Sequence, residues 1–260
     1  AFGPGQRRYL SVQPRPAMVV RRRPAAAESR RSRLPVAATA RRPLLKRPAA
    51  RRAAPAGRRP LFLLAPGASN RPSQAVRGCL ERWGEVREFV YPGKGTPNLL
   101  GRRAECLGAH LAELRAAAAV AGGRPIWLAG ASFGARCAAE LLVETATPPA
   151  VKGLIALGYP LVALGDQRQP DPRKRKQDRS KPLLALPPHK RALLISCERD
   201  PFLAGDRGAA LRKIAKGMAA PCAVALLAGS SHNPVTPRTE DDIHGALQAF
   251  LGCRTGSGKA

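Results

Sequence analysis

Residues 126–136 read Ile126-Trp127-Leu128-Ala129-Gly130-Ala131-Ser132-Phe133-Gly134-Ala135-Arg136, an apolar run followed by Gly-x-Ser-x-Gly and an alanine-rich helical pattern. This order is typical of a strand that turns sharply into a helix and carries a serine at the turn. The two glycines are needed because the serine backbone is strained and because strand and helix pack too closely beside it for a Cβ atom. The pattern therefore predicts that Ser132 projects its hydroxyl into open space as a nucleophile.

On both sides of this turn, from Leu61 onward, short apolar runs alternate with helical patterns. This alternation is typical of an α/β fold whose mostly parallel sheet is doubly wound, with helices on both faces. The expected strands are 61–65, 86–90, 126–129, 151–157, 192–197 and 223–228. The expected helices lie near 73–83, 104–121, 133–144, 206–217 and 239–251.

The helix expected near 104–121 has apolar residues at spacings of three and four, which predict its buried stripe. They are Ala104, Leu107, Leu111, Leu114, Ala118 and Ala121.

The first part of the chain differs in composition from the rest. Of the formal net charge of +28, residues 1–60 supply +16 through sixteen arginines, Lys46 and a single acid, Glu28. Proline and alanine recur there without a periodic apolar pattern, so that little surface can be buried to offset the entropy of the chain. We expect residues 1–59 to form a basic, disordered arm, residues 60–254 to form one domain, and residues 255–260 to form a flexible tail.

Three interpretations of this arm remain open on composition. An Arg-rich, acid-poor leader matches an organelle transit peptide, which would direct the protein to a plastid or mitochondrion. A nucleic-acid or membrane-surface arm would bind through charge, but only Phe2 and Tyr9 are available for base stacking, so nucleic acid is the less favoured partner. A compositionally biased extension without function is the third interpretation.

The connection 162–190 interrupts the alternation of strands and helices. It is rich in proline, which argues against a large helical lid, and it carries eight basic residues against three acidic ones. The run Arg173–Lys176 is typical of a solvated loop, although it also fits an anionic substrate. An open site favours a small or water-accessible substrate over a long-chain lipid.

The cysteines and the lengths of the apolar runs indicate the environment in which the protein works. The six cysteines are far apart and form no Cys-x-x-Cys pair, so they indicate neither a disulfide framework nor a zinc site. They are typical of small core residues of an intracellular protein in a reducing compartment. No apolar run approaches the ~18 residues that a membrane-spanning helix needs.

A serine nucleophile needs a histidine that takes its proton and an acid that orients the histidine. Of the four histidines, His232 alone lies in a loop directly after an expected strand, and parallel sheets have their sites at the carboxyl ends of strands. The acid is expected after the preceding strand, where Asp200 is the first choice and Glu198 the alternative. The order Ser132, Asp200, His232 is the chain order of α/β hydrolases.

Acyl transfer also needs N–H donors for the developing oxyanion. The amide of Phe133, directly after the serine, is expected to be one donor. The second is expected from the turn after the first strand, where Ala68 or Ser69 could direct an amide inward, with Ala68 preferred. This chemistry requires no cofactor and no metal.

Several blocks of the sequence resemble one α/β-hydrolase-like group. The blocks are Ala65–Ala68, Tyr91–Gly95, Gly130–Arg136, Gly153–Leu161 and Arg199–Phe202. The group includes the testis-expressed hydrolase-like proteins and the hydrolase-like domain of a subunit of the NSL acetyltransferase complex, with bacterial and plant relatives similar to dienelactone hydrolases. The resemblance covers about Pro60 to Gly252.

This resemblance implies an α/β-hydrolase fold with Ser132 as nucleophile, Asp200 as acid and His232 as base. The chain departs from the group at two places. It has Pro66-Gly67-Ala68-Ser69 where relatives commonly have His-Gly-Ala-Gly, and Ser231-His232-Asn233 where they often have Asp-His-Ser. The function expected is that of a serine hydrolase acting on an ester-like bond. The alternatives are a non-catalytic binding or scaffold module of the same fold and a nucleic-acid binder that uses the basic arm.

Overall fold

The computed structural model describes residues 59–71, 73–93, 102–144, 147–164, 179–203 and 207–252. Most of the basic arm, the C-terminal tail and the basic run Arg173–Lys176 therefore lie outside the described residues. The expectations for these segments stay predictions.

The described residues form a six-stranded sheet with the order β2-β1-β3-β4-β5-β6, in which every neighbouring pair is parallel. The strands are β1 (Leu61–Ala65), β2 (Glu85–Glu88), β3 (Ile126–Ala131), β4 (Val151–Leu157), β5 (Arg191–Cys197) and β6 (Cys222–Leu227). The strands β1 and β3 are continuous apolar runs, and β4 is one after Lys152, because helices cover both faces of the sheet. The predicted doubly wound α/β fold is confirmed.

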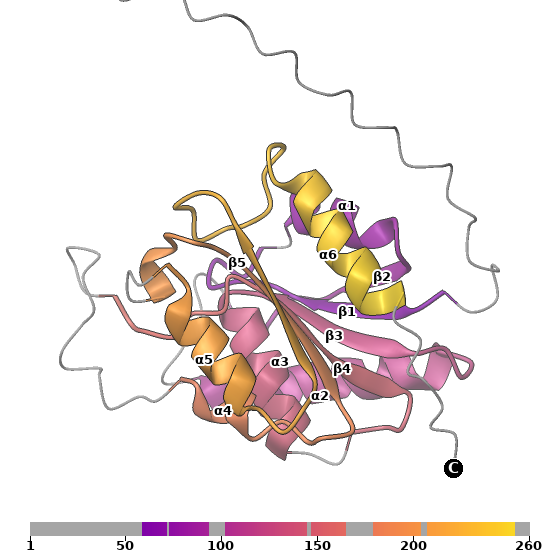
Figure 1. Ribbon diagram of the computed structural model, residues 1–260. Helices are drawn as coiled ribbons and strands as arrows, with labels where there is room; N and C mark the ends of the chain where they lie inside the picture. The colour runs from indigo at the N-terminus through magenta and orange to yellow at the C-terminus, as the bar shows by residue number, and fades with distance from the viewer. Residues whose placement is uncertain are drawn as a thin grey trace, which may run out of the picture. The chain divides into compact units, whose positions relative to one another are not determined.

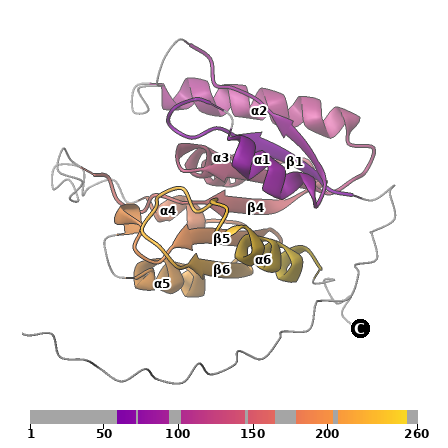
Figure 2. The same cartoon turned by 90° about the horizontal axis from the view of Figure 1, so that it is seen from above.

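Two helical layers enclose the sheet, as Figure 1 and the turned view in Figure 2 show. The helices are α1 (Gln74–Glu81), α2 (Arg103–Val120), α3 (Phe133–Glu144), α4 (Lys181–Leu184), α5 (Ala209–Gly217) and α6 (Glu240–Gly252). One core contains buried residues of α2, α3, α4 and α5, and the other contains buried residues of α1 and α6. Because β1 leads to α1 and β3 leads to α3, the connections after these neighbouring strands diverge to opposite faces. Such a divergence opens a crevice at the carboxyl ends of the strands.

The predicted strands lie within one or two residues of the observed ones. One difference concerns β3, which extends to Ala131 because Gly130 and Ala131 pair with Ala156 and Leu157 of β4. The strand thus continues to the residue before Ser132, so that the sheet itself fixes the position of the serine.

The predicted stripe of α2 is partly confirmed, because Leu114 and Ala121 are buried, but the centre of the buried face lies beside the stripe. The helix buries Cys106, His110, Leu114 and Ala117, whereas Leu107, Leu111 and Ala118 are only partly buried and Ala104 is exposed. Small apolar residues occur on every side of this helix, so their spacing defines the buried face weakly. A histidine and a cysteine, which the apolar pattern did not count, occupy the buried face.

None of the helices in the described segments is both long and apolar enough to cross a membrane.

Candidate active site

The turn between β3 and α3 holds Ser132 in a left-handed backbone conformation, with φ of +51°. A Cβ at Gly130 would lie 2.5 Å from the amide nitrogen of Ala135, and one at Gly134 would lie 2.5 Å from the carbonyl oxygen of Pro66. The Ser132 amide donates to the carbonyl of Leu157 at 2.9 Å, which anchors the turn to β4. The structure thus has the close packing and the strained serine that the Gly-x-Ser-x-Gly pattern predicts.

This packing predicts opposite effects for two Gly→Ala substitutions. Gly134→Ala should lower the free energy of unfolding by about 3 kcal/mol, because the backbone carbonyls of Ala65 and Pro66 cannot move aside. Gly245→Ala, in α6 with open space around the new methyl group, should raise it by about 1 kcal/mol through helix propensity. Urea unfolding of both variants measures the difference, and a Gly134→Ala protein as stable as the wild type would contradict the packing argument.

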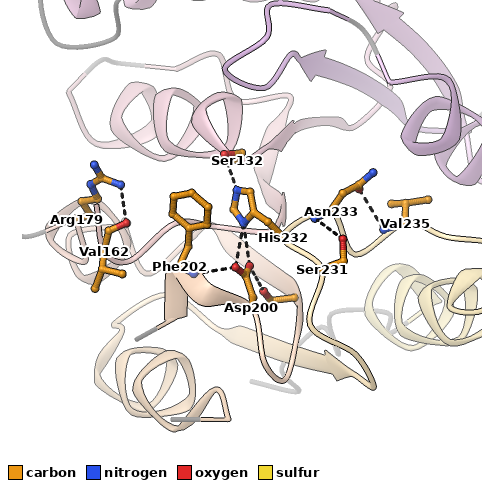
Figure 3. A network of polar contacts seen from close by, with 10 residues as sticks. Ser132, Val162, Arg179, Asp200, Phe202, Ser231, His232, Asn233 and Val235 are labelled. Atoms are coloured by element: carbon orange, nitrogen blue, oxygen red, sulfur yellow. Dashed lines mark hydrogen bonds and ion pairs between the residues drawn. The ribbon is translucent and has the colours of Figure 1, made fainter. Parts of the chain in front are cut away.

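The three side chains predicted from sequence come together at the carboxyl ends of β3, β5 and β6, as Figure 3 shows. The Ser132 Oγ atom lies 2.8 Å from Nε2 of His232. On the other side of the ring, Nδ1 of His232 lies 2.9 and 3.1 Å from the two carboxylate oxygens of Asp200. In this arrangement Nδ1–H donates to the carboxylate and Nε2 is free to accept the serine proton.

Asp200 is the acid that reaches the histidine, whereas the alternative, Glu198, is exposed. The Asp200 side chain is fully buried. Its carboxylate accepts from the Ser196 hydroxyl at 3.0 Å and from the Phe202 amide at 2.9 Å. Because several donors surround it, the carboxylate is held in one orientation toward the ring.

His232 is positioned by contacts from the loop after β5 and the turn after β4, and by a hydrogen bond between the two loops that carry Asp200 and His232. The Phe202 ring lies 4.0 Å from the imidazole ring, measured between their centroids. Gly158 has φ of +62°, and a Cβ there would lie 2.3 Å from the carbonyl oxygen of His232, so only glycine fits beside the loop. The Arg199 amide donates to the carbonyl of Gly229 at 3.0 Å, which joins the loops after β5 and β6.

The turn after β1 lies beside the serine. A Cβ at Gly67 would lie 4.0 Å from Cβ of Ser132. The Asn70 side chain accepts from the Tyr91 amide at 2.8 Å and donates to the Tyr91 carbonyl at 2.9 Å, which fixes the turn to the segment after β2. Ala68 is half-buried against the core, whereas the alternative, Ser69, is exposed.

The other predicted donor, the Phe133 amide, is in the first turn of α3. The N–H groups of a first helical turn have no acceptor within their own helix, and they form the positive end of the helix dipole.

Sequence reasoning missed three residues that support this site: Ser196, Phe202 and Gly158. Ser196 gave one usable signal, because it is a polar residue in the buried strand Leu193–Cys197. Phe202 and Gly158 lie in two of the blocks that resemble the hydrolase-like group, but the blocks do not show which loop lies against His232. Such contacts arise from tertiary packing and leave no periodic pattern.

One group of potential metal ligands occurs among the residues that the structure describes. Ligand atoms of Cys79, Glu240 and His244 lie within 4.8 Å of one another, on the α1 and α6 side of the sheet. However, the Trp83 indole N–H donates to Nδ1 of His244 at 3.2 Å. This hydrogen bond occupies the Nδ1 lone pair, so Nδ1 is not free to bind an ion, and Nε2 lies 3.4 Å from Oε1 of Glu240. Arg82 is also paired with Glu240, so the group does not favour a metal.

The family of the chain is shown by its match to a family model. Residues 93–248 match a family model described as an alpha/beta hydrolase domain. No curated protein matches the sequence of the chain.

Solved structures share the fold at low sequence identity. Est1E from Butyrivibrio proteoclasticus, solved with ferulic acid bound, is 16% identical with a TM-score of 0.55, over 75% of this chain and 89% of that one. TT1662 from Thermus thermophilus is 23% identical with a TM-score of 0.52, over 77% and 92%. XC6422 from Xanthomonas campestris, described as a serine hydrolase without lid, is 18% identical with a TM-score of 0.53, over 75% and 82%.

Proposed function

Because the chain belongs to the alpha/beta hydrolase domain family, we propose that it is a serine hydrolase that cleaves an ester-like bond through an acyl-serine intermediate. One observation carries the proposal, namely the continuous hydrogen bonding from Ser132 through His232 to the buried Asp200. A serine hydroxyl is a poor nucleophile alone, and this arrangement provides both a base and a group that stabilises the base when it is protonated.

In the first half of the reaction, Nε2 of His232 takes the proton of Ser132 as Oγ attacks the ester carbonyl carbon. The π electron pair of the carbonyl moves to its oxygen, where the amides of Phe133 and Ala68 stabilise the negative charge. The tetrahedral intermediate then collapses, and protonated His232 donates its proton to the leaving alkoxide. Alcohol departs and the acyl group remains on Oγ.

In the second half, His232 takes a proton from water as the water oxygen attacks the acyl carbon. Collapse of the second intermediate breaks the bond to Oγ, and the proton returns from His232 to Ser132. The acid product leaves, and the enzyme is regenerated without a cofactor. Asp200 stays ionised throughout, since it orients the ring and balances the charge of the imidazolium.

The descriptions of two structural neighbours support a substrate of small size. One is described as a serine hydrolase without lid, and another was solved with ferulic acid bound. In this chain the proline-rich connection 162–190 is predicted to form no large lid, and an open site also favours a small substrate. Membership of the testis-expressed and NSL-complex group, residues 60–254 as the domain, and a reducing intracellular compartment remain our predictions.

Labelling with a fluorophosphonate probe tests the proposal, because such probes react with serines that a neighbouring base activates. We expect the wild-type protein to be labelled, and the Ser132→Ala and His232→Ala variants to be unlabelled. The Ser231→Ala variant is the matched control, since Ser231 is an exposed serine of the His232 loop and should leave labelling intact. A folded wild-type protein that never reacts would favour the non-catalytic binding module instead.

A further inference from the structure

Two arginines lie close to each other at the edge of the candidate active site. Arg136 is in α3, one helical turn after Ser132, and its amide donates to the Ser132 carbonyl at 3.2 Å. Because side chains on a helix tilt toward its N-terminus, the Arg136 side chain leans toward the end of α3 where the serine lies. It is mostly buried, with 16% of its side chain exposed.

Arg179 reaches the same region from the segment that precedes α4. Its Nη1 atom donates to the Val162 carbonyl at 2.8 Å, and its own carbonyl accepts from the Tyr159 hydroxyl at 2.8 Å. The Val162 amide donates in turn to the carbonyl of Phe202, whose ring packs on His232. In the view of Figure 3, Phe202 lies between Arg179 and His232.

The charges of this region are out of balance among the described residues. Burial, followed by the positive charge of Arg136, lowers the pKa of Arg179 to about 10, so the two guanidinium groups destabilise each other. The acid nearby is Glu140, which is buried and lies 2.6 Å from Nε of Arg103 and 3.4 Å from Nη2 of Arg136. Glu140 is therefore shared by two arginines, and the described ion pairs include no acid for Arg179.

The hydrogen bonding of the two arginines is also incomplete. Nε of Arg136 and Nε of Arg179 are both buried, and neither has a hydrogen-bond partner within the described segments. A buried donor without an acceptor destabilises the folded protein, because the hydrogen bond that it makes with water in the unfolded chain is lost. A bound oxyanion would accept from such donors and would also relieve the repulsion between the two positive charges, since guanidinium groups match carboxylate geometry.

From these contacts we propose that Arg136 and Arg179 form an anion subsite beside Ser132, and that the substrate is an ester whose acyl part carries a carboxylate group. The inference rests on the proposed hydrolase function for the bond that is cleaved. It also assigns a role to Arg136 that the Gly-x-Ser-x-Gly pattern alone does not provide.

A pair of p-nitrophenyl esters with acyl chains of equal length tests the subsite. The mono-ester of glutaric acid carries the carboxylate, and the ester of valeric acid does not. We expect the wild-type protein to prefer the glutaryl ester in kcat/KM by about tenfold or more, because a charge-assisted hydrogen bond contributes about 1.5–3 kcal/mol. The Arg136→Gln and Arg179→Gln variants should lose about 10- to 100-fold on the glutaryl ester through KM, and less than about twofold on the valeryl ester.

Two further variants separate binding from structure. Arg179→Lys keeps the positive charge and should retain part of the preference for the glutaryl ester. If Arg179 had only a structural role, the lysine would not preserve this preference. Arg115→Gln removes an exposed positive charge of α2 and should change neither ester. Equal losses on both esters in the Gln variants, or a wild-type protein that hydrolyses the valeryl ester as well as the glutaryl ester, would overturn the subsite while the hydrolase function stands.

A binding measurement separates the subsite from turnover. Calorimetric titration of glutarate into the Ser132→Ala protein should detect binding that weakens at least about tenfold when Arg179→Gln is added. Unchanged affinity would overturn the subsite whether or not the wild-type protein hydrolyses esters. Inorganic phosphate serves as the second ligand, and tighter binding of phosphate than of glutarate would overturn the assignment to a carboxylate.

Discussion

Replacing Asp200 with asparagine should lower kcat for ester hydrolysis by about 10⁴-fold. The asparagine amide group would donate to Nδ1 of His232, so the ring would carry its proton on Nε2 and could not accept the proton of Ser132. The Ser196 hydroxyl and the Phe202 amide would remain around the side chain and keep the loop in place. Steady-state kinetics on p-nitrophenyl valerate measure the loss, with KM expected to change little.

The matched control is Glu198→Gln, two residues earlier on the same turn. It makes the same change from a carboxylate to an amide, but the Glu198 side chain is exposed. The backbone N–H of residue 198 donates to the Leu227 carbonyl in the wild type and in the variant. Activity should stay within about twofold of the wild type. A loss of less than about tenfold in Asp200→Asn, or equal losses in both variants, would exclude Asp200 as the group that orients the base.

Replacing His110 with leucine should stabilise the protein and flatten the dependence of stability on pH. His110 is fully buried in α2, packs against the rings of Phe89 and Tyr91, and has no hydrogen-bond partner for either ring nitrogen among the described residues. Burial lowers its pKa from 6.5 to about 3. The folded protein therefore holds a neutral imidazole that the unfolded chain would protonate.

The sign of this effect follows from proton binding. Between pH 6.5 and about 3 the unfolded state binds a proton at His110 that the folded state does not, so the free energy of unfolding falls as the pH falls. His110 alone makes the free energy of unfolding change with pH by up to about 1.4 kcal/mol per pH unit. The His110→Leu variant should lack this pH dependence, and its free energy of unfolding at neutral pH should be about 1–3 kcal/mol higher than that of the wild type.

Urea titrations at pH values from about 7 down to about 4 measure the effect of His110. The exposed His189 provides the control, and His189→Gln should change the free energy of unfolding by no more than about 0.5 kcal/mol. If the wild-type and His110→Leu proteins lose stability in parallel as the pH falls, His110 is not the group responsible.

Most strands of the sheet could be predicted from the sequence because they are buried on both faces. A run such as Leu61–Ala65 is apolar throughout, so its ends are visible in the sequence. The buried face of α2 was less visible, since alanine surrounds the helix and His110 was counted as polar. The difference shows that apolar spacing indicates a buried face well only when polar residues occupy the other faces.

The candidate site likewise contains residues that could be predicted from the sequence and residues that could not. Ser132, Asp200 and His232 were predictable because each follows a recognisable strand, and parallel strands end at one edge of the sheet. The approach of Arg179 to Arg136 was not predictable, because the two arginines are 43 positions apart and no local pattern joins them. Only the packing of the segment before α4 against α3 and the β5 loop brings them together.

The parallel sheet also has a consequence for how the molecule assembles. None of its strand pairs is a hairpin, so each pairing must close a long loop before it gains any contact, which makes folding slow. Ser132 and His232 are 100 positions apart, and they meet only when β6 has joined the far side of the sheet. Reaction of Ser132 with a phosphonate during refolding would therefore report when β6 joins the sheet, and it would be absent from intermediates in which β6 is not yet in place.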